Sequence, residues 1–433
     1  MDDELLPLDE GAVRAILEAV EGLQESAVHL LARLVRHRST LGQERRCLDD
    51  MADVYRACHL EPFPVPVDVQ ALQDKPGFSP PLIGYEGRDN VAAIHRCESP
   101  KGRSLLLQGH VDVVPEGAAE LWTSPPYEAA VRDGRMYGRG AADMKAGIVA
   151  YVTAFDAIRH AGLRPAADLQ FAAVIEEECT GNGALAVMHA LPKPDACLIP
   201  EPGPGYPALY VAEVGVVWAW VTITGKPAHV REMHAGVNAI EAAYVVAERF
   251  KAYEAEMNRA ERRHPAFAAE NHPINVNLGT IEGGEWNSSV PTRAKLGFRV
   301  GLMPGHAAAD VKGEIEALVD EARRDPRLAG ARLDVSFGGF IAAGAIFAPE
   351  QPISRAISRL HADVTGSELR HYNALGLTDA RFYALYQGTQ ATCYGPDSEN
   401  IHGIDESVGL ASLCDVTKVI ALTIAGWCGL ETA

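Results

Sequence analysis

An apolar run that ends in two polar side chains constrains the fold of this chain more than any other stretch. The run is Leu105-Leu-Leu-Gln-Gly-His-Val-Asp-Val-Val-Pro115, and its first residues are typical of a buried strand. His110 and Asp112 are two residues apart, so on a continuing strand they point to the same face. An imidazole beside a carboxylate is the smallest pattern of a metal ligand with its orienting partner. A structural histidine bonded to a nearby aspartate gives the same pattern, so the rest of the chain must decide.

Other segments place a carboxylate or an imidazole where an apolar element begins or ends. They are Asp143 before a predicted helix at 148–158, Glu176-Glu-Glu178 after a predicted strand at 169–175, Glu201 after a strand at 196–199, and His402 after a strand at 389–393. Taken singly, these residues have ordinary explanations: a helix cap, a solvated acidic turn, an incidental loop histidine. Because ligands bind outside the carboxyl ends of the strands in an open α/β sheet, their coincidence favours one shared site.

The side chains at these ends suit metal ions. The set comprises His110, Asp143, Glu178, Glu201 and His402, with Asp112 and Glu177 beside them. Two imidazoles and three carboxylates suit Zn²⁺ or a similar divalent ion. One ion would leave too many carboxylates unneutralised, whereas two ions bridged by one carboxylate use all five ligands and leave positions for water. A further carboxylate with a raised pKa can take a proton from that water and pass it to a leaving amine.

Size and charge exclude several classes of protein. A chain of 433 residues favours two domains, and a net charge of −19 argues against a nucleic-acid partner. No apolar run approaches about 18 residues, so no membrane span is expected. The start, Met1-Asp-Asp-Glu-Leu-Leu6, lacks the basic and apolar regions of a signal peptide. The eight cysteines form no CxxC pair, which indicates reduced thiols and a cytoplasmic location.

The order of predicted elements divides the chain. Residues 1–213 and 342–433 alternate strands and helices, as in an α/β domain, and residues 214–341 follow the order βαββαβ of a ferredoxin-like module. Within these parts, the strands predicted at 90–94 and 104–107 are expected to be neighbours. The polar stretch 252–272 is expected to be an exposed loop. A helix at 407–426 is expected to be the last element of the α/β domain. The sequence therefore predicts one α/β domain interrupted by a smaller module.

Several motifs, in their order and spacing, resemble one known family. They are Gly109-His-Val-Asp-Val-Val-Pro115, Gly138-Arg-Gly-Ala-Ala-Asp-Met-Lys145, Glu177-Glu178, Pro200-Glu-Pro202 and His402 near Glu406. The chain resembles the M20 metallopeptidases, the group of acetylornithine deacetylase, succinyl-diaminopimelate desuccinylase, aminoacylase and glutamate carboxypeptidase. The resemblance covers nearly the whole length. It implies a zinc-peptidase-like α/β catalytic domain with an inserted lid that also joins two copies of the chain into a homodimer.

The resemblance also implies roles for the matching residues. Asp143 would bridge two metal ions, with His110 and Glu201 completing one site and Glu178 and His402 the other. Asp112 would orient His110, and Glu177 would be the general base and acid. His229 would reach into the partner subunit's active site and polarise the scissile carbonyl, and Asn287 would line the substrate site; a core or surface role for both stays open. The expected ions are Zn²⁺, with Co²⁺ or Mn²⁺ as alternatives.

One departure from the family pattern concerns the substrate. Members that hold an amino-acid carboxylate commonly carry Arg three residues before a Pro-Gly pair, and here that position is Gly301, with Arg299 as the nearest arginine. Whether an arginine on this strand binds the α-carboxylate of the substrate therefore stays open. Arg299 would share a strand face with residue 301.

The sequence supports three hypotheses for function. The first is a hydrolase that cleaves the amide bond of a small N-acyl amine or N-acyl amino acid. The second is a family member acting on a formamide or an aromatic amine. The third is a non-enzymatic relative that only binds a ligand, which we would expect to have lost Glu177 or a metal ligand.

Overall fold

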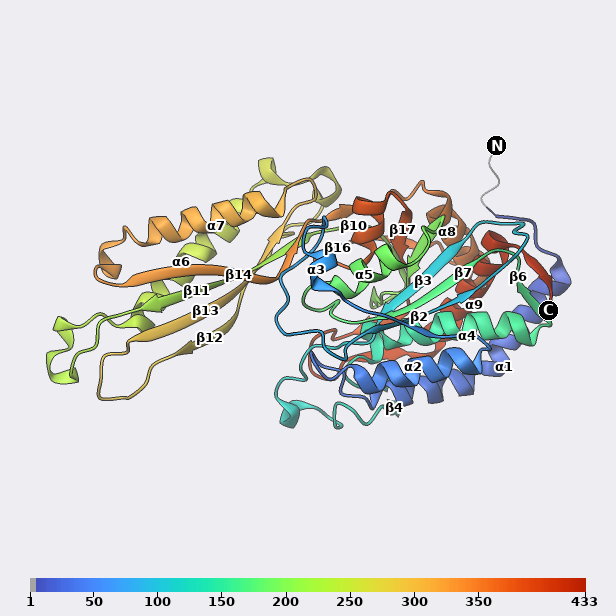
Figure 1. Cartoon of the computed structure of the whole chain (residues 1–433), viewed down its shortest axis with the longest axis horizontal. Helices are drawn as coiled ribbons and strands as arrows, with labels where there is room; N and C mark the ends of the chain where they lie inside the picture. The colour runs from blue at the N-terminus through green and yellow to red at the C-terminus, as the bar shows by residue number, and fades with distance from the viewer. Residues whose placement is uncertain (1–4) are drawn as a thin grey trace.

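A computed structural model describes residues 5–433 of the chain (Figure 1). Residues 1–4, the start of the segment inspected for a signal peptide, lie outside the described part. The large lobe is built from residues that precede and follow a smaller lobe in the sequence. We call the smaller lobe the lid, and it projects to the left in Figure 1. The predicted α/β domain with an inserted ferredoxin-like module is the observed fold class.

The central sheet of the large lobe positions the candidate site. Its strands lie in the order β1 (Phe63–Val65), β2 (Asn90–His95), β7 (Leu169–Val174), β3 (Leu105–His110), β8 (Ala196–Ile199) and β17 (Gln390–Cys393). β3 runs parallel to both β7 and β8, and these strands are buried along their whole length, as near-continuous apolar runs in parallel sheets are. The prediction that β2 and β3 are neighbours was wrong. β7 lies between them, because a local pattern carries no information on strand order.

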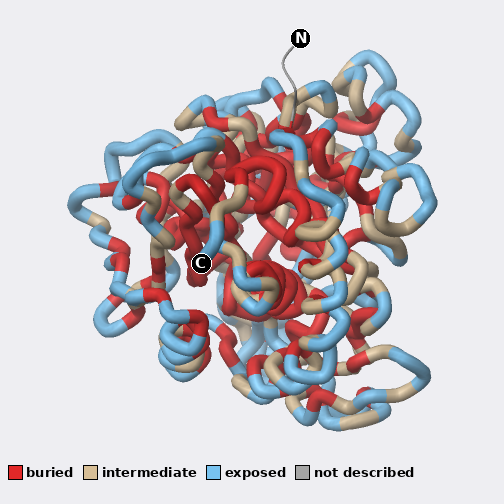
Figure 2. Tube along the Cα trace, turned by 90° about the vertical axis from the view of Figure 1, so that its right-hand side faces the viewer, coloured by how far each residue is buried: buried red, intermediate tan, exposed pale blue. Residues whose placement is uncertain are grey.

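Helices pack around this sheet, and the most buried of them gather at the centre of the lobe (Figure 2). The helices of the large lobe are α1 (Glu10–Val35), α2 (Arg45–Ala57), α3 (Val69–Leu72), α4 (Ala146–His160), α5 (Asn182–Ala190), α8 (Pro352–Thr365) and α9 (Leu410–Cys428). Asp9 caps α1 by accepting hydrogen bonds from the main-chain N–H groups of Gly11 and Ala12. α9 is the one helix within residues 5–433 that is long and apolar enough to cross a membrane. It packs against α1, α4 and α8, so its composition is that of a core helix.

Short strands complete the large lobe. One small sheet has the order β4 (Ala130–Arg132), β5 (Arg135–Tyr137), β19 (Ser407–Gly409), β18 (Asp397–Glu399) and β9 (Gly203–Pro204), and β6 (Leu163–Pro165) pairs with β20 (Leu430–Thr432). The helix predicted to begin at residue 407 begins at Leu410 instead. The preceding residues form β19, which pairs with β5.

The lid is an antiparallel sheet with helices on one face. Its elements are β11 (Gly215–Thr224), α6 (Ala239–Met257), β12 (Val276–Gly283), β13 (Arg293–Leu302), α7 (Ala308–Ala322) and β14 (Arg332–Ala342), and the sheet order is β12-β13-β11-β14. The ring of Phe250 on α6 stacks on Phe298 of β13 at 3.7 Å. The stretch 252–272 is not simply exposed, because α6 continues through part of it and Phe267 is buried with Met257.

Two adjacent crossings join the lid to the large lobe. β10 (Ala208–Glu213) leads into β11, and β14 leads back into β15 (Ala345–Ile346), which pairs with β10. β10 also pairs with β16 (Arg370–Ala374) of the large lobe. The N–H group of Gly339 on β14 donates to the carbonyl of Pro80 at 2.9 Å. The division at residues 213 and 341 stays our prediction of the domain boundaries.

Candidate metal centre

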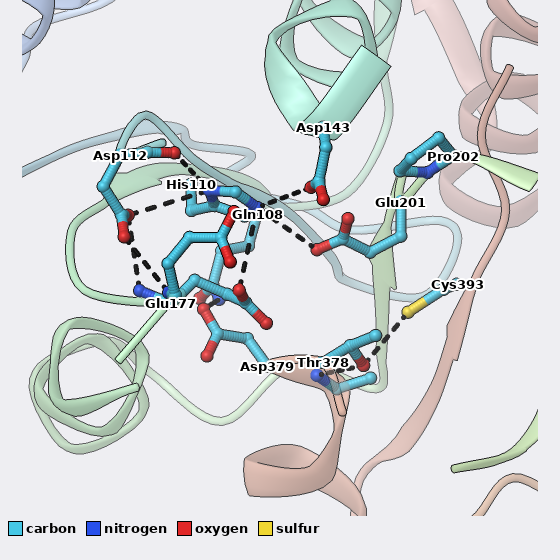
Figure 3. A network of polar contacts seen from close by, with 12 residues as sticks. Gln108, His110, Asp112, Asp143, Glu177, Glu201, Pro202, Thr378, Asp379 and Cys393 are labelled. Carbon is cyan, nitrogen blue, oxygen red and sulfur yellow. Dashed lines mark hydrogen bonds and ion pairs between the residues drawn. The ribbon is translucent and has the colours of Figure 1, made fainter. Parts of the chain in front are cut away.

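The predicted ligands come from neighbouring chain segments at one edge of the central sheet, and Figure 3 shows three of them, His110, Asp143 and Glu201. His110 ends β3, Glu178 follows β7, and Glu201 follows β8. Because β3 lies between the other two and runs parallel to both, these carboxyl ends open at the same edge. Asp143 comes from the turn before α4, and His402 comes from the loop between β18 and β19. The structure therefore brings all five residues together.

Asp143 lies between two groups of possible ligands. Its Oδ1 is 3.1 Å from Nε2 of His110, and its Oδ2 is 3.3 Å from Nε2 of His402. Glu201 Oε1 is 3.8 Å from His110 Nε2, and Glu178 Oε1 is 3.1 Å from His402 Nε2. We call His110, Asp143 and Glu201 the His110 subsite, and Asp143, Glu178 and His402 the His402 subsite. In each, the donor atoms lie within 4.8 Å of one another, and Asp143 belongs to both.

The electrostatics of the cluster favour a bound cation. Burial raises the pKa of Glu177 and of Glu201 well above the ordinary glutamate value, and neighbouring carboxylates add to the increase. Burial alone would lower the pKa of His110, but its contact with Asp143 and the nearby glutamates raise that pKa well above the usual range. The charge of Glu178 raises the pKa of His402 to about 11. Protons and divalent ions compete for such atoms, so the cluster is a site for positive charge.

Asp112 contacts both His110 and the segment of Glu177 and Glu178 that follows β7. Nδ1 of His110 lies 2.8 Å from the main-chain carbonyl of Asp112, while the Asp112 carboxylate is 3.7 Å from the same nitrogen. That carboxylate instead accepts the N–H groups of Glu177 and Glu178, at 3.3 and 3.1 Å. The predicted orienting contact to His110 is therefore mainly a main-chain one, and the side chain fixes the residues after β7.

Sequence reasoning did not identify several buried groups that support the site. Glu176, with a positive φ of 63°, turns away from the ligands and pairs with Arg88 at 2.8 Å. On the other side of Glu177, Asp379 accepts a hydrogen bond from Gln108 Nε2 at 3.2 Å, and burial raises the pKa of Asp379 to about 6 (Figure 3). The signals available were an arginine in a loop and a carboxylate before an apolar stretch, which are too common to assign.

The predicted residues of the lid lie apart from this centre. His229 and Asn287 are exposed, and His229 Nδ1 accepts the N–H group of Arg231 at 3.1 Å. The loop at 225–236 is at the far left of Figure 1, away from the large lobe, and pairs at His229 with Ser289. The structure therefore does not bring these two residues to the ligands of their own chain.

Arg299 lies where the lid meets the large lobe. Its Nη2 donates to the carbonyl of Leu375 at 2.9 Å, and its Nη1 donates to the carbonyl of Asn275 at 3.4 Å. A Cβ atom at Gly301 would lie 3.4 Å from Nη1, so the guanidinium covers that position, as their shared strand face predicts. Burial lowers the pKa of Arg299 to about 10, which leaves it a cation at neutral pH.

Known proteins resemble the chain over most of its length. The model of "Peptidase family M20/M25/M40" matches residues 106–426. An N-formyl-4-amino-5-aminomethyl-2-methylpyrimidine deformylase of Halalkalibacterium halodurans is 26% identical over 378 residues, covering 81% of this chain and 85% of that one. A succinyl-diaminopimelate desuccinylase of Xylella fastidiosa is 29% identical over 356 residues, covering 80% and 88%. The solved structure of the dipeptidase Dug1p from Saccharomyces cerevisiae matches with a TM-score of 0.79 at 13% identity, covering 96% and 98%.

Proposed function

Because this chain belongs to peptidase family M20/M25/M40, a group of metal-dependent hydrolases, we propose that it cleaves the amide bond of a small N-acyl amine or N-acyl amino acid. The observation that carries the proposal is the pair of subsites that share Asp143. Because every ligand and the adjacent Glu177 are present, the non-enzymatic hypothesis has no support from the residues of the site.

The donor set fits two divalent ions. The two oxygens of Asp143 face different histidines, as a bridging carboxylate requires, and each subsite adds one histidine and one glutamate. A mixed nitrogen and oxygen donor set suits Zn²⁺, with Co²⁺ or Mn²⁺ as alternatives. When bound, such ions activate the attacking water and polarise the substrate carbonyl.

Glu177 is placed to move the proton of the reaction. Its carboxylate lies 3.8 Å from His110 Nε2, it is almost fully buried, and its main-chain N–H is held by Asp112. A buried carboxylate of raised pKa can accept a proton near neutral pH and return it. Glu177 therefore takes the proton of the attacking water and delivers it to the leaving nitrogen.

A second substrate class has its own support. One relative is a deformylase of a formamido pyrimidine, so this family includes hydrolysis of an N-formyl group on a flat ring compound. In this chain Arg299 donates to two main-chain carbonyls and has no adjacent arginine at Gly301 to share the binding of an α-carboxylate. A formamide or an aromatic amine derivative is therefore the alternative to an N-acyl-α-amino acid.

The outer edge of the lid supports a homodimer. β12 is the terminal strand of its sheet, and its residues after Val276 are exposed. The exposed fractions of Ile281 and Trp286 are 54% and 73%, which is unusual for large apolar side chains at a free strand edge. Pairing of two lids would cover this edge and let His229 of one subunit act in the site of the other. The eight free cysteines support a cytoplasmic location, and the net charge of −19 supports small-molecule rather than nucleic-acid substrates.

Metal removal and reconstitution test the proposal. The protein is stripped with a chelator and titrated with Zn²⁺, Co²⁺ or Mn²⁺ while bound metal and hydrolysis of N-acetyl, N-succinyl, N-formyl and aryl amide substrates are measured. We expect two ions per chain and hydrolysis of at least one amide class that depends on them. Binding of fewer than two ions, or no turnover of any amide by the fully loaded protein, would contradict the proposal.

A further inference from the structure

A buried arginine connects the segments that carry the metal ligands. Arg139 follows β5 and is 2% exposed. Its Nη1 donates to the carboxylate of Glu406, and its Nη2 donates to the carbonyl of Gly403 at 3.0 Å and to that of Pro115 at 3.5 Å. One guanidinium thus contacts the segment after β3 and both sides of the loop that leads from His402 to β19.

Glu406 links Arg139 to Asp143, the residue that belongs to both subsites. Its Oε1 accepts the N–H groups of Ala142 and Asp143, each at 3.1 Å, while its other oxygen faces Arg139. The side chain of Glu406 is fully buried, so this carboxylate depends on Arg139 for its neutralising charge. The turn that presents Asp143 is therefore fixed by Glu406, which lies 263 residues after Asp143 in the sequence and is itself paired with Arg139.

The loop that carries His402 needs such support. Asn400, His402 and Asp405 have positive φ angles of 56°, 60° and 56°. For residues other than glycine, this conformation is unfavourable and persists only where the surroundings impose it. From the solvent side, the Asp405 carboxylate accepts the N–H and hydroxyl groups of Thr123 at 2.9 and 2.6 Å. From the protein interior, Arg139 donates a hydrogen bond to the carbonyl of Gly403 in the same loop.

We propose that Arg139 is a positioning residue that sets the geometry of the His402 subsite. It acts on Asp143 through Glu406 and on His402 through Gly403. The proposal rests on the two-metal function proposed above. The His110 subsite depends on it less, because His110 ends a buried strand and is held by the Asp112 carbonyl, and the main-chain N–H of Glu201 bonds to Ile199 at 2.8 Å. Only the planar fork of an arginine can serve acceptors in these separate directions.

The experiment compares Arg139→Lys and Arg139→Gln with Arg135→Lys as a matched control. Arg135 lies on β5, four residues before Arg139, and also donates to the segment around Ser407, but its hydrogen bonds reach neither Gly403 nor Glu406. Stripped proteins are titrated with Co²⁺, and the affinity of each binding step is followed by calorimetry and by visible absorption. We expect the weaker step to lose about 10- to 100-fold in affinity in Arg139→Gln and less in Arg139→Lys. The tighter step should lose less, because only Asp143 of the His110 subsite is held through Glu406. Arg135→Lys should match the wild type.

Glu406→Gln is a second variant in case Arg139 variants fold poorly. Its amide oxygen can still accept the N–H group of Asp143, but the ion pair is lost, so the same selective weakening is expected. Folded Arg139 variants that bind both ions with wild-type affinity, or equal losses in the Arg139 and Arg135 variants, would overturn the positioning role alone. A wild-type protein that binds only one ion would reject the proposed function itself, and the positioning role with it.

Discussion

The metal centre and the tip of the lid hold their polar side chains in opposite ways. At the centre, His110 and Glu177 are buried and each carboxyl-end segment is bonded back into the large lobe. At the tip, His229 and Asn287 are exposed, and His229 bonds to Arg231 and pairs with Ser289 of the same lid. The candidate metal ligands are thus held in place by their own chain before any ion binds, whereas nothing in the large lobe of the same chain holds His229.

The largest effect is expected at the centre, from Glu177→Gln. The amide cannot accept the proton, so kcat should fall by about 10²- to 10⁴-fold. Glu177 also lies within 4.8 Å of donor atoms of His110 and Glu178, but it is outside the two subsites that share Asp143, so metal binding should persist. Steady-state kinetics and metal analysis provide the measurement. The neighbouring variant Glu178→Gln is the contrast and should lose an ion as well as activity; equal metal loss in both variants would refute the separate roles.

The second prediction tests whether the lid serves another subunit. His229→Ala should lower kcat by about 10²-fold, as loss of one carbonyl-polarising group does. When equal amounts of the His229→Ala and Glu177→Gln proteins are unfolded, mixed and refolded together, activity should recover to about a quarter of the wild-type value. Half of the dimers should be mixed, and one of the two sites in each mixed dimer is intact. Activity assays of the mixture against each variant refolded alone provide the measurement. No recovery, in a mixture shown to contain mixed dimers, would place His229 outside the partner's site.

The third prediction concerns the edge that should bring the partner there. Ile281→Lys places a charge on the exposed strand β12 and should weaken dimerisation by about 10-fold or more, from the lost burial of one isoleucine. Analytical ultracentrifugation across a concentration series measures the change. Ile346→Lys, at a residue 41% exposed outside the lid, is the control and should leave the dimer intact. An unchanged dimer in the Ile281 variant would move the interface elsewhere.

The smallest effect is expected where the chain leaves the large lobe for the lid. Glu213 accepts the N–H and hydroxyl groups of Thr378, and burial raises its pKa from 4.5 to about 8. Between these values the native protein keeps a proton that the unfolded chain releases, so the free energy of unfolding falls as pH rises. The expected loss from Glu213 is about 2 kcal/mol between pH 6 and pH 8. Urea unfolding of the wild type and of Glu213→Gln measures it, and an identical pH dependence in both would remove Glu213 as its source.

The convergence of three candidate ligands could be predicted from sequence because each follows an apolar run. His110, Glu178 and Glu201 follow strands whose burial the composition already indicates, and parallel strands deliver their ends to one edge. The pair of Arg139 and Glu406 could not be predicted, because its partners are 267 residues apart and neither has a periodic pattern. The place of β7 between β2 and β3 also depends on tertiary pairing, which local patterns do not contain.

Insertion of the lid between β10 and β15 has a consequence for synthesis on the ribosome. The segment that carries His110, Asp143 and Glu201 emerges first, and the loop that carries His402 emerges only after the whole lid. Because domains fold as units, the large lobe is incomplete until β17, α8 and α9 follow the lid. The last of the five candidate ligands therefore arrives with the last tenth of the chain, after the whole lid has been made.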